Sequence, residues 1–465
     1  MTPPRRPSPG VPEGTPHVRT VGRGFSRAVM ALALMSCPLA AAAQTPMPLT
    51  LADAVARGKA TAPRLMEADA REAAAVASRE SRATLDKPTV TALSGYVRTN
   101  HVPEYSIPQA GGGSRVLFPD IPDNFRVRTE LLWPVWTGGR VDALVTSAEA
   151  DVRAAQADGQ VVAADLAMEI TQAYWALVTG REAVTVIDQS LARTDAWVAD
   201  VQARLDAGLV SPHEVLTARA RRARDLVQRI QAAHAAATAE RELARLVGMP
   251  GQAIDPVSPI DRPWEGLAAL TSRQPADVVA LARESRAERG AFTARQSAFR
   301  SAADAAMAAS HPQVAALAAL EPARPNNRFV PRQNTWHVSW DLGVTVTWSL
   351  WDSGRAKADR AVAEAQARAF DHRLAEFDGR VSVDVQQRLQ DVESGNAAIA
   401  AAGEAVAASE EAHRVLRERY AAGVATSTEV LDAQVAVLEA RLERTRLQAS
   451  LRVSEARLRR AVGVD

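Results

Sequence analysis

The sequence contains the same unit twice, and this duplication constrains the fold more than any other feature. Gly139-Arg140 recurs as Gly354-Arg355, 215 positions later, and Ala148-Glu149-Ala150 recurs as Ala363-Glu364-Ala365 at the same offset. Further matches at this offset pair Arg204, Gly208, Glu214, Val215 and Leu216 with Arg419, Gly423, Glu429, Val430 and Leu431, and Val247-Gly248 with Val462-Gly463. The offset is unchanged across 110 positions, which indicates no insertions between the copies, so both halves are predicted to fold into the same series of elements.

The first copy is predicted to contain a helix, two strands separated by a loop, a very long helix, a turn and a returning helix. The expected ranges are helix 49–85, strand 88–99, loop 101–124, strand 125–136, helix 140–206 and helix 212–248. The long helix contains no proline. Gly208, Ser211 and Pro212 mark the turn, with Ser211 predicted as the N-cap and Pro212 at the first helical position.

The second copy repeats this order, with strands near 313–320 and 335–351 and a long helix over 355–421. A proline-rich stretch over 249–276 is predicted to be an ordered connector between the copies. The predicted domains are therefore a first repeat over 44–248, this connector, and a second repeat over 277–465.

The helix lengths predict how the helices are arranged. Each long helix has 67 residues, which is about 100 Å at 1.5 Å per residue. The opening and returning helices of a copy, laid end to end, have about the same length. We therefore expect one long helix flanked by two half-length helices. Because 47% of residues are hydrophobic but only 5% are aromatic, small side chains must form the contacts, as in laterally packed coiled coils.

The stretch 335–351 alternates strictly between apolar and polar residues. Trp340, Leu342 and Val344 share one parity, while Asp341 and Thr345 share the other. This pattern predicts a membrane β-strand with one face toward lipid, although a soluble sandwich strand shows the same alternation. Tryptophans gather near the strand ends, and the predicted membrane-interface aromatics are Trp133, Trp136, Trp336, Trp340, Trp348 and Trp351.

Two copies supply only four strands, and four strands cannot enclose a barrel. The chain must therefore oligomerise in the membrane. Two chains would give eight strands, whose side chains fill the interior, whereas three would give twelve strands and an open channel. Twelve strands are favoured if the polar faces line a passage. The outer membrane is the expected location, because inner-membrane proteins span the bilayer as helices.

The first 43 residues have the features of a secretory signal peptide. Arg19, Arg23 and Arg27 precede an apolar run, and Ala41 and Ala43 provide a small-x-small cleavage site before residue 44. A membrane anchor is an alternative, although the run is short for a span. Lipidation at Cys37 is a second alternative. Cleavage after residue 43 would remove the only cysteine, which suits an oxidising compartment.

Three segments resemble the outer membrane efflux proteins, the TolC-like family. Residues 49–56 resemble the family's opening helix, residues 351–355 its strand-to-helix junction, and residues 419–434 its tip motif. The resemblance implies a homotrimer with a shared 12-stranded β-barrel in outer-membrane lipid and a periplasmic α-barrel tunnel. It also implies docking to a periplasmic adaptor that joins an inner-membrane pump.

The same resemblance makes the helical tips candidates for adaptor docking. The candidate residues are Gly208, Leu209, Ser211, Gly423, Val424 and Thr426. An alternative explanation for the two glycines is a helix C-cap that needs positive φ, and both explanations can hold.

No motif in the sequence predicts catalysis, a cofactor or a metal site. Walker A, His-Glu-x-x-His and Gly-x-Ser-x-Gly patterns are absent, so we predict no catalytic, cofactor-binding or metal-binding residue. The formal net charge of +1 gives no reason to expect a nucleic-acid partner.

The predicted function is a non-enzymatic exit duct for small molecules, served by an RND, ABC or type I secretion pump. A periplasmic adaptor with helical hairpins and a soluble periplasmic enzyme are the alternatives.

Overall fold

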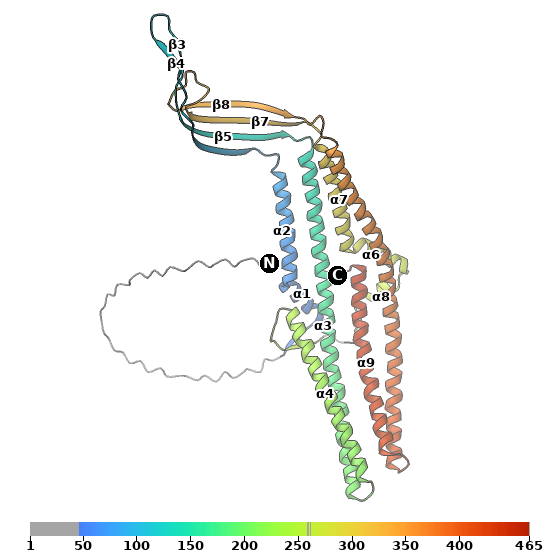
Figure 1. Cartoon of the computed structure of the whole chain (residues 1–465). Coiled ribbons are helices and arrows are strands. Elements are labelled where there is room, and N and C mark those ends of the chain that lie inside the picture. The colour runs from blue at the N-terminus through green and yellow to red at the C-terminus, as the bar shows by residue number, and fades with distance from the viewer. Residues whose placement is uncertain (1–45, 258–259, 261, 465) are drawn as a thin grey trace, which may run out of the picture. The chain divides into compact units, whose positions relative to one another are not determined.

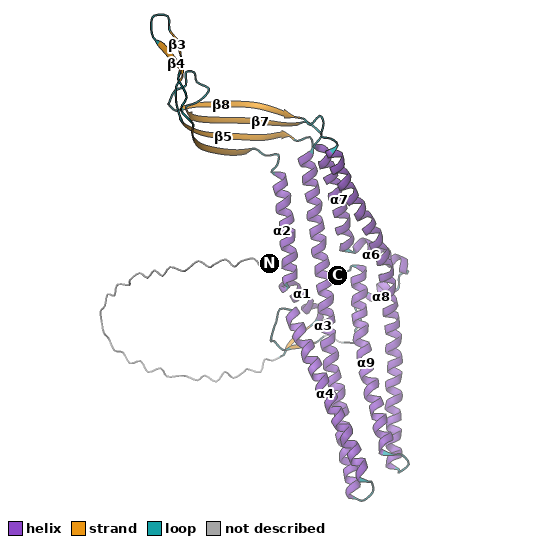
Figure 2. Cartoon of the chain, viewed as in Figure 1, coloured by secondary structure: helices purple, strands orange, loops and turns teal. Residues whose placement is uncertain are grey.

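The computed structural model describes residues 46–257, 260 and 262–464, which belong to one compact unit. Within this unit, a four-stranded sheet lies at one end of a set of long helices. The two turns that each connect a long helix to the next helix lie at the other end (Figure 1, Figure 2). The predicted signal peptide and Cys37 lie outside the described residues.

Both copies contain the predicted series of elements. In the first copy these are β1 (Met47–Leu49), α1 (Leu51–Thr61), α2 (Pro63–Ala83), β2 (Thr89–Arg98), β3 (Tyr105–Pro108), β4 (Ser114–Phe118), β5 (Asp123–Trp136), α3 (Arg140–Asp206) and α4 (Pro212–Leu246). There follow β6 (Ile254–Pro256), α5 (Leu267–Thr271), α6 (Pro275–Ser285), α7 (Ala287–Ala308), β7 (Gln313–Arg324), β8 (His337–Thr347), α8 (Arg355–Ala421) and α9 (Ser427–Val462). The two long helices have the predicted bounds.

The prediction of one continuous helix over 49–85 is wrong. The helix breaks at Ala62, whose ψ is 122°, because Pro63 lacks an N–H group and disfavours a helical residue before it. The second copy breaks at the same point in the order of its elements, between α6 and α7, without a proline. There Arg286 is extended, with ψ also 122°, and its guanidinium pairs with Glu288 and Asp384.

Two predicted irregular segments contain regular structure. The loop 101–124 holds the β3–β4 hairpin, whose three turn glycines all have positive φ. The connector holds α5 and β6, and β6 pairs in parallel with β1. Glu240 and Glu455, which are 215 positions apart, both hold the connector: they accept backbone N–H groups from Ile254 at 2.8 Å and Trp264 at 3.4 Å.

Each long helix is flanked by half-length helices, as the lengths predict. The helix α3 contacts α2 and α7 on the side of the sheet, and α4 and α9 on the side of the turns (Figure 1). The buried core lies where these half-length helices meet. At its centre Tyr174 is fully buried, donates its hydroxyl to Leu49 O at 3.0 Å and contacts the ring of Trp175 edge-on.

The sheet is antiparallel throughout, in the order β2-β5-β7-β8, so β2 and β8 are its edges. The register pairs Thr129 with Leu320 and Leu320 with Trp340, which places these three on one face. Asp341 lies on the opposite face. One face of the sheet is therefore apolar and the other polar.

Two glycines in α3 give a test of the close helix packing. A methyl group added at Gly159 would meet only Ala68 Cβ, at 3.9 Å, whereas one at Gly180 would lie 3.0 Å from Ala236 Cα. We expect Gly159→Ala to stabilise the protein by about 1 kcal/mol through helix propensity. We expect Gly180→Val to destabilise it by about 1–3 kcal/mol through overpacking. Thermal unfolding followed by circular dichroism measures both, and equal shifts would contradict this packing.

Candidate functional site

The apolar face of the sheet is exposed along the whole of β8. On β8, Trp340 is 68% exposed, Leu342 75% and Val344 70%, and the neighbouring Leu320 is 49% exposed. A soluble protein rarely leaves a continuous face of this kind uncovered. The pattern of apolar outside and polar inside is instead that of a transmembrane barrel strand.

The six predicted interface tryptophans are all exposed and lie mostly in two groups. Trp133, Trp136, Trp348 and Trp351 lie at the end of the sheet next to the helices, Trp336 lies at the other end, and Trp340 lies between. A bulge between Pro134 and Trp136 turns Trp136 to the face of Trp133. Trp336 packs against Phe125, which packs against Tyr96.

The spacing of the two aromatic groups matches a bilayer. From Trp336 to Trp348 is 12 residues, about 40 Å along a strand, and a tilt of ~45° reduces this to about 28 Å across the membrane. The hydrocarbon core is ~30 Å thick. This match supports the interfacial role of these tryptophans, which stays a prediction.

The predicted docking tips are the turns between α3 and α4 and between α8 and α9. Gly208 has φ 74° and Gly423 has φ 76°, as the C-cap alternative requires. The next residue in each turn, Leu209 or Val424, donates its N–H back into the helix, at 2.8 and 2.9 Å. Leu209 is 74% exposed and Val424 is 62% exposed, so each turn presents one apolar side chain to its surroundings.

The two returning helices begin differently, although their sequences correspond. Thr426 and Glu429 form a reciprocal capping box at the start of α9. Ser211 occupies the predicted N-cap position of α4, but its side chain makes no capping hydrogen bond. Glu214, the counterpart of Glu429, instead accepts a hydrogen bond from the Tyr420 hydroxyl at 3.1 Å. The tip of the first hairpin is therefore tied to the tip of the second.

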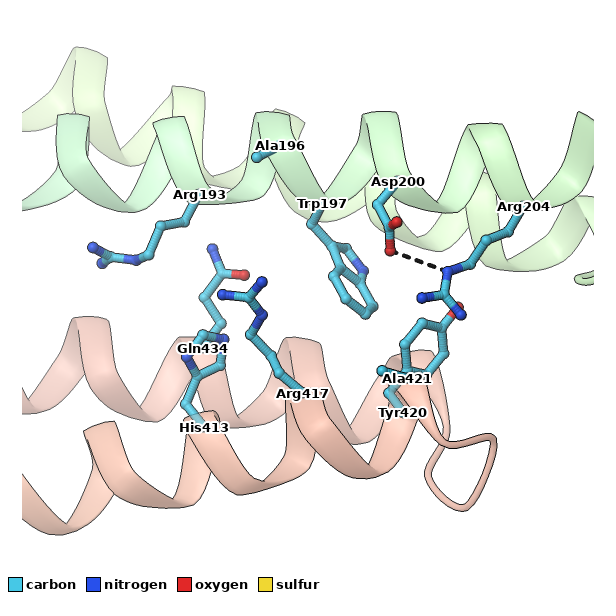
Figure 3. A pocket seen from close by; sticks show the side chains of 10 residues that line it. All are labelled: Arg193, Ala196, Trp197, Asp200, Arg204, His413, Arg417, Tyr420, Ala421 and Gln434. Carbon is cyan, nitrogen blue, oxygen red and sulfur yellow. Dashed lines mark hydrogen bonds and ion pairs between the residues drawn. The ribbon is translucent and has the colours of Figure 1, made fainter.

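Further contacts join the two hairpins around Tyr420 (Figure 3). The centroid of the Tyr420 ring lies 4.8 Å from that of the Trp197 ring. The Arg204 guanidinium lies 4.8 Å from the centroid of the Tyr420 ring. Arg204 also pairs with Asp200 at 3.2 Å. A cavity of about 310 Å³ lies beside these residues, between α3 and α8. The cavity is small and partly polar, and we call the contacts between the two hairpins beside it the Tyr420 joint.

Burial controls the charge of two groups at this joint. Burial, together with the hydrogen bond to Glu214, raises the pKa of Tyr420 to about 12, so its hydroxyl stays protonated and can donate. Burial and the nearby Arg417 and Arg193 lower the pKa of His413, which is therefore neutral at neutral pH.

The sequence alone did not single out the Trp197–Tyr420 contact. The usable signal was the aromatic residue three positions before the turn glycine, Tyr420 before Gly423, inside the tip motif. Its partner Trp197 lies more than 200 positions away on another helix. No local pattern predicts which residue it meets.

The geometry agrees with comparisons to known proteins. The family described as outer membrane efflux protein matches residues 56–249 and 278–464. Protein CyaE of Bordetella pertussis is 37% identical over 133 residues, which is 28% of this chain and 26% of the length of that protein. The crystal structure of CusC superposes with a TM-score of 0.74 at 16% identity, covering 89% of this chain and 92% of that chain. The open state of the Neisseria gonorrhoeae MtrE outer membrane channel gives 0.71 at 17% identity, covering 89% of both chains.

The chain belongs to the outer membrane efflux protein family. It is therefore an outer-membrane channel protein with a helical periplasmic extension, and not an enzyme. This assignment replaces the alternatives of a periplasmic adaptor and a soluble enzyme.

The two faces of β8 give a test of the membrane assignment. Leu342, midway between Trp336 and Trp348, lies on the apolar face, and Thr345 lies on the polar face. We expect Leu342→Arg to cost about 2–4 kcal/mol per chain, because it places a charge in hydrocarbon. The matched variant Thr345→Arg should be tolerated. The yield of assembled protein in outer-membrane fractions measures both, and equal yields would contradict the assignment.

Proposed function

We propose that three copies of this chain form the exit duct of a tripartite export system. Small molecules would pass from an inner-membrane pump and a periplasmic adaptor to the exterior. One observation carries the proposal. The sheet and both layers of helices leave their first and last elements without a neighbour on one side, and the two repeats follow in the same order in all three. The pump supplies the energy, and the channel supplies a passage and a gate.

The membrane sheet requires neighbouring chains. Unpaired N–H and C=O groups on the edges of β2 and β8 cannot remain in hydrocarbon, so β8 must pair with β2 of another copy. The helical layers repeat this arrangement. On the side of the sheet the order of contacts is α2-α3-α7-α8, and on the side of the turns it is α4-α3-α9-α8. In each layer the first and last elements are free to meet across copies.

Internal symmetry identifies the matching surface on α4. In the second copy, one stripe of α9 is covered, and it includes the buried Leu431 and Thr445 and the partly buried Leu442. The stripe on α4 that lies 215 positions earlier is exposed: Leu216 is 63% exposed, Val227 53% and Ile230 58%. An apolar stripe that is buried in one repeat and exposed in the other indicates a contact completed by a second chain.

The partner surface is on α8. The face of α3 that receives α9 has its counterpart on α8 at positions such as Ala401, Ala405 and Ala412, all of which are exposed. Small side chains allow two helices to approach closely. The α4 stripe of one copy therefore fits the α8 face of the next. Three copies then give twelve strands, which leave an open passage, whereas two copies give eight, which do not.

A charge in the α4 stripe tests this assembly. We expect Ile230→Arg to abolish most trimer formation, because it buries an unpaired charge at the proposed interface. Gln228→Arg is the matched control. Its counterpart in the second copy, Glu443, is exposed, so we expect position 228 to stay outside the interface and to tolerate a charge. The amount of heat-resistant trimer on gels, together with the mass of the assembled protein in detergent, is measured for both variants. Normal trimers from Ile230→Arg would contradict the interface.

The Tyr420 joint is the proposed gate at the periplasmic end. It links the two hairpins of one chain through ring packing and the hydrogen bond to Glu214, so the hairpins can separate only when these contacts break. The exposed residues at the turns, Leu209 and Val424 among them, are the proposed docking points for the adaptor. Docking would favour the separated state.

Single-channel conductance in planar bilayers tests the gate and the function together. Tyr420→Phe removes the hydroxyl but keeps the ring, and a hydrogen bond to a carboxylate contributes about 1.5–3 kcal/mol. We expect open probability to rise about tenfold or more, since 1.4 kcal/mol corresponds to a factor of ten. Tyr174→Phe removes an equivalent hydroxyl far from the turns and should leave gating unchanged. Absence of current from every assembled variant would contradict the channel function.

A further inference from the structure

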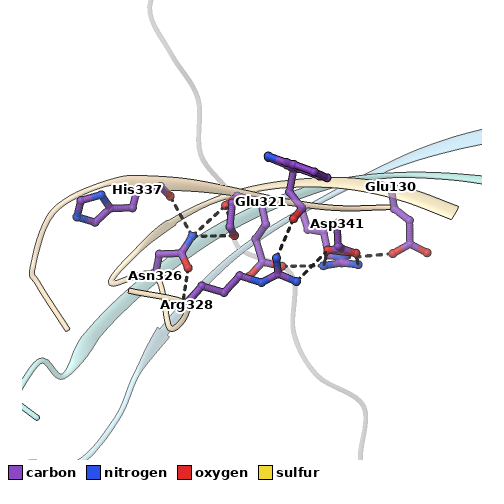
Figure 4. A network of polar contacts seen from close by, with 9 residues as sticks. Glu130, Glu321, Asn326, Arg328, His337 and Asp341 are labelled. Carbon is purple, nitrogen blue, oxygen red and sulfur yellow. Dashed lines mark hydrogen bonds and ion pairs between the residues drawn. The ribbon is translucent and has the colours of Figure 1, made fainter. Parts of the chain in front are cut away.

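The loop between β7 and β8 is folded over the polar face of the sheet. It spans residues 325–336, whereas hairpin loops usually have 2–5 residues. Asn326 is 98% buried and donates hydrogen bonds to Glu321 O, His337 O and Ser339 Oγ, at 3.0–3.2 Å (Figure 4). This amide fixes the start of the loop to both strands.

Two further loop residues contact side chains of the polar face. Arg328 donates to Trp340 O at 2.8 Å, and its guanidinium lies 3.8 Å from the Asp341 carboxylate. The ring of Phe329 stacks on that of His337, with centroids 4.5 Å apart. His337 and Asp341 share the polar parity of β8, so the loop lies on the side that would face the channel interior.

A charge cluster lies beneath this loop. Arg128 pairs with Glu130 at 3.1 Å, Glu321 at 3.0 Å and Asp341 at 3.3 Å, and Asp341 is shared with Arg328. Arg128 and Arg328 together carry two positive charges against these three carboxylates, so the cluster by itself has a net charge of −1. The side chain of Arg328 remains 59% exposed.

A second arginine on the polar face is exposed close to this cluster. Arg126 lies two residues before Arg128 on β5, so both side chains are on the same face of the sheet. Within the described part of the chain the structure gives Arg126 no ion pair. The loop also brings Arg332 to this face, where it donates to Asn124 Oδ1 at 3.4 Å. This end of the polar face thus carries Arg126, Arg128, Arg328 and Arg332 against three carboxylates, a net charge of +1. Arg126 and Arg328 are the exposed cations among them.

We propose that the loop over 325–336 forms a second constriction, at the end of the barrel away from the helices, and that Arg126 and Arg328 make this constriction prefer anions. The proposal rests on the trimeric channel proposed above. Three inward loops narrow a twelve-stranded lumen, and charges in a narrow passage bounded by protein act strongly on passing ions. Solutes that carry carboxylate or phosphate groups would pass more readily than cations.

Reversal potentials in a KCl gradient test the proposal. They are measured in the Tyr420→Phe background, because a closed gate in series would mask any effect at the outer end. We expect Arg126→Gln and Arg328→Gln each to lower the chloride-to-potassium permeability ratio, and the double variant to lower it about threefold or more. Arg328→Gln should also raise conductance, since it removes a contact that holds the loop inward.

Arg98→Gln is the matched control. Arg98 lies at the same end of the sheet but on the apolar parity, where it pairs with Asp123, so its loss should leave selectivity unchanged. Arg126→Gln has no ion pair to lose, so it keeps the test valid if the loop variant assembles poorly. An unchanged ratio in Arg126→Gln and the double variant would overturn the anion preference while the channel function stands. No current from assembled wild type or Tyr420→Phe would contradict the channel itself.

Discussion

The requirement that backbone groups in hydrocarbon be hydrogen-bonded determines how the rest of this protein is built. A sheet of four strands leaves two open edges, β2 and β8, and lipid offers no partner for them. Closure across copies satisfies these groups, and it fixes the order of the helices attached to the strands. The alternating strands, the two repeats and the unpaired helix faces are all consequences of building a barrel from shared parts.

The two repeats make equivalent contacts at the connector, but their contacts differ at the turns. Glu240 and Glu455 hold the connector in equivalent ways. Glu214 and Glu429 do not behave alike, because one accepts a hydrogen bond from Tyr420 and the other caps its own helix. At the joint that we propose as the gate, an interaction between hairpins replaces an interaction within one helix. The Tyr420 joint is thus a local difference between two otherwise corresponding turns.

Much of the architecture was predictable because it depends on local patterns. The absence of proline over 67 residues and the glycine at each end gave the bounds of α3 and α8, and strict alternation gave β8 and its apolar face. Prediction failed where a short segment depends on a distant partner. The strand β1 exists because β6 lies beside it, and the break at Arg286 accompanies ion pairs to Glu288 and Asp384 rather than a proline.

The sequence by itself determined the repeat, the helix lengths, the lipid-facing parity of the strands and the need for more than one copy. Each follows from periodicity, which a chain carries in its order of residues. Only the tertiary structure decided that Tyr420 meets Trp197 and Glu214, that α4 is left open where α9 is covered, and that the loop containing Arg328 folds over the polar face of the sheet. Those contacts join residues far apart in the chain, and packing geometry selects them.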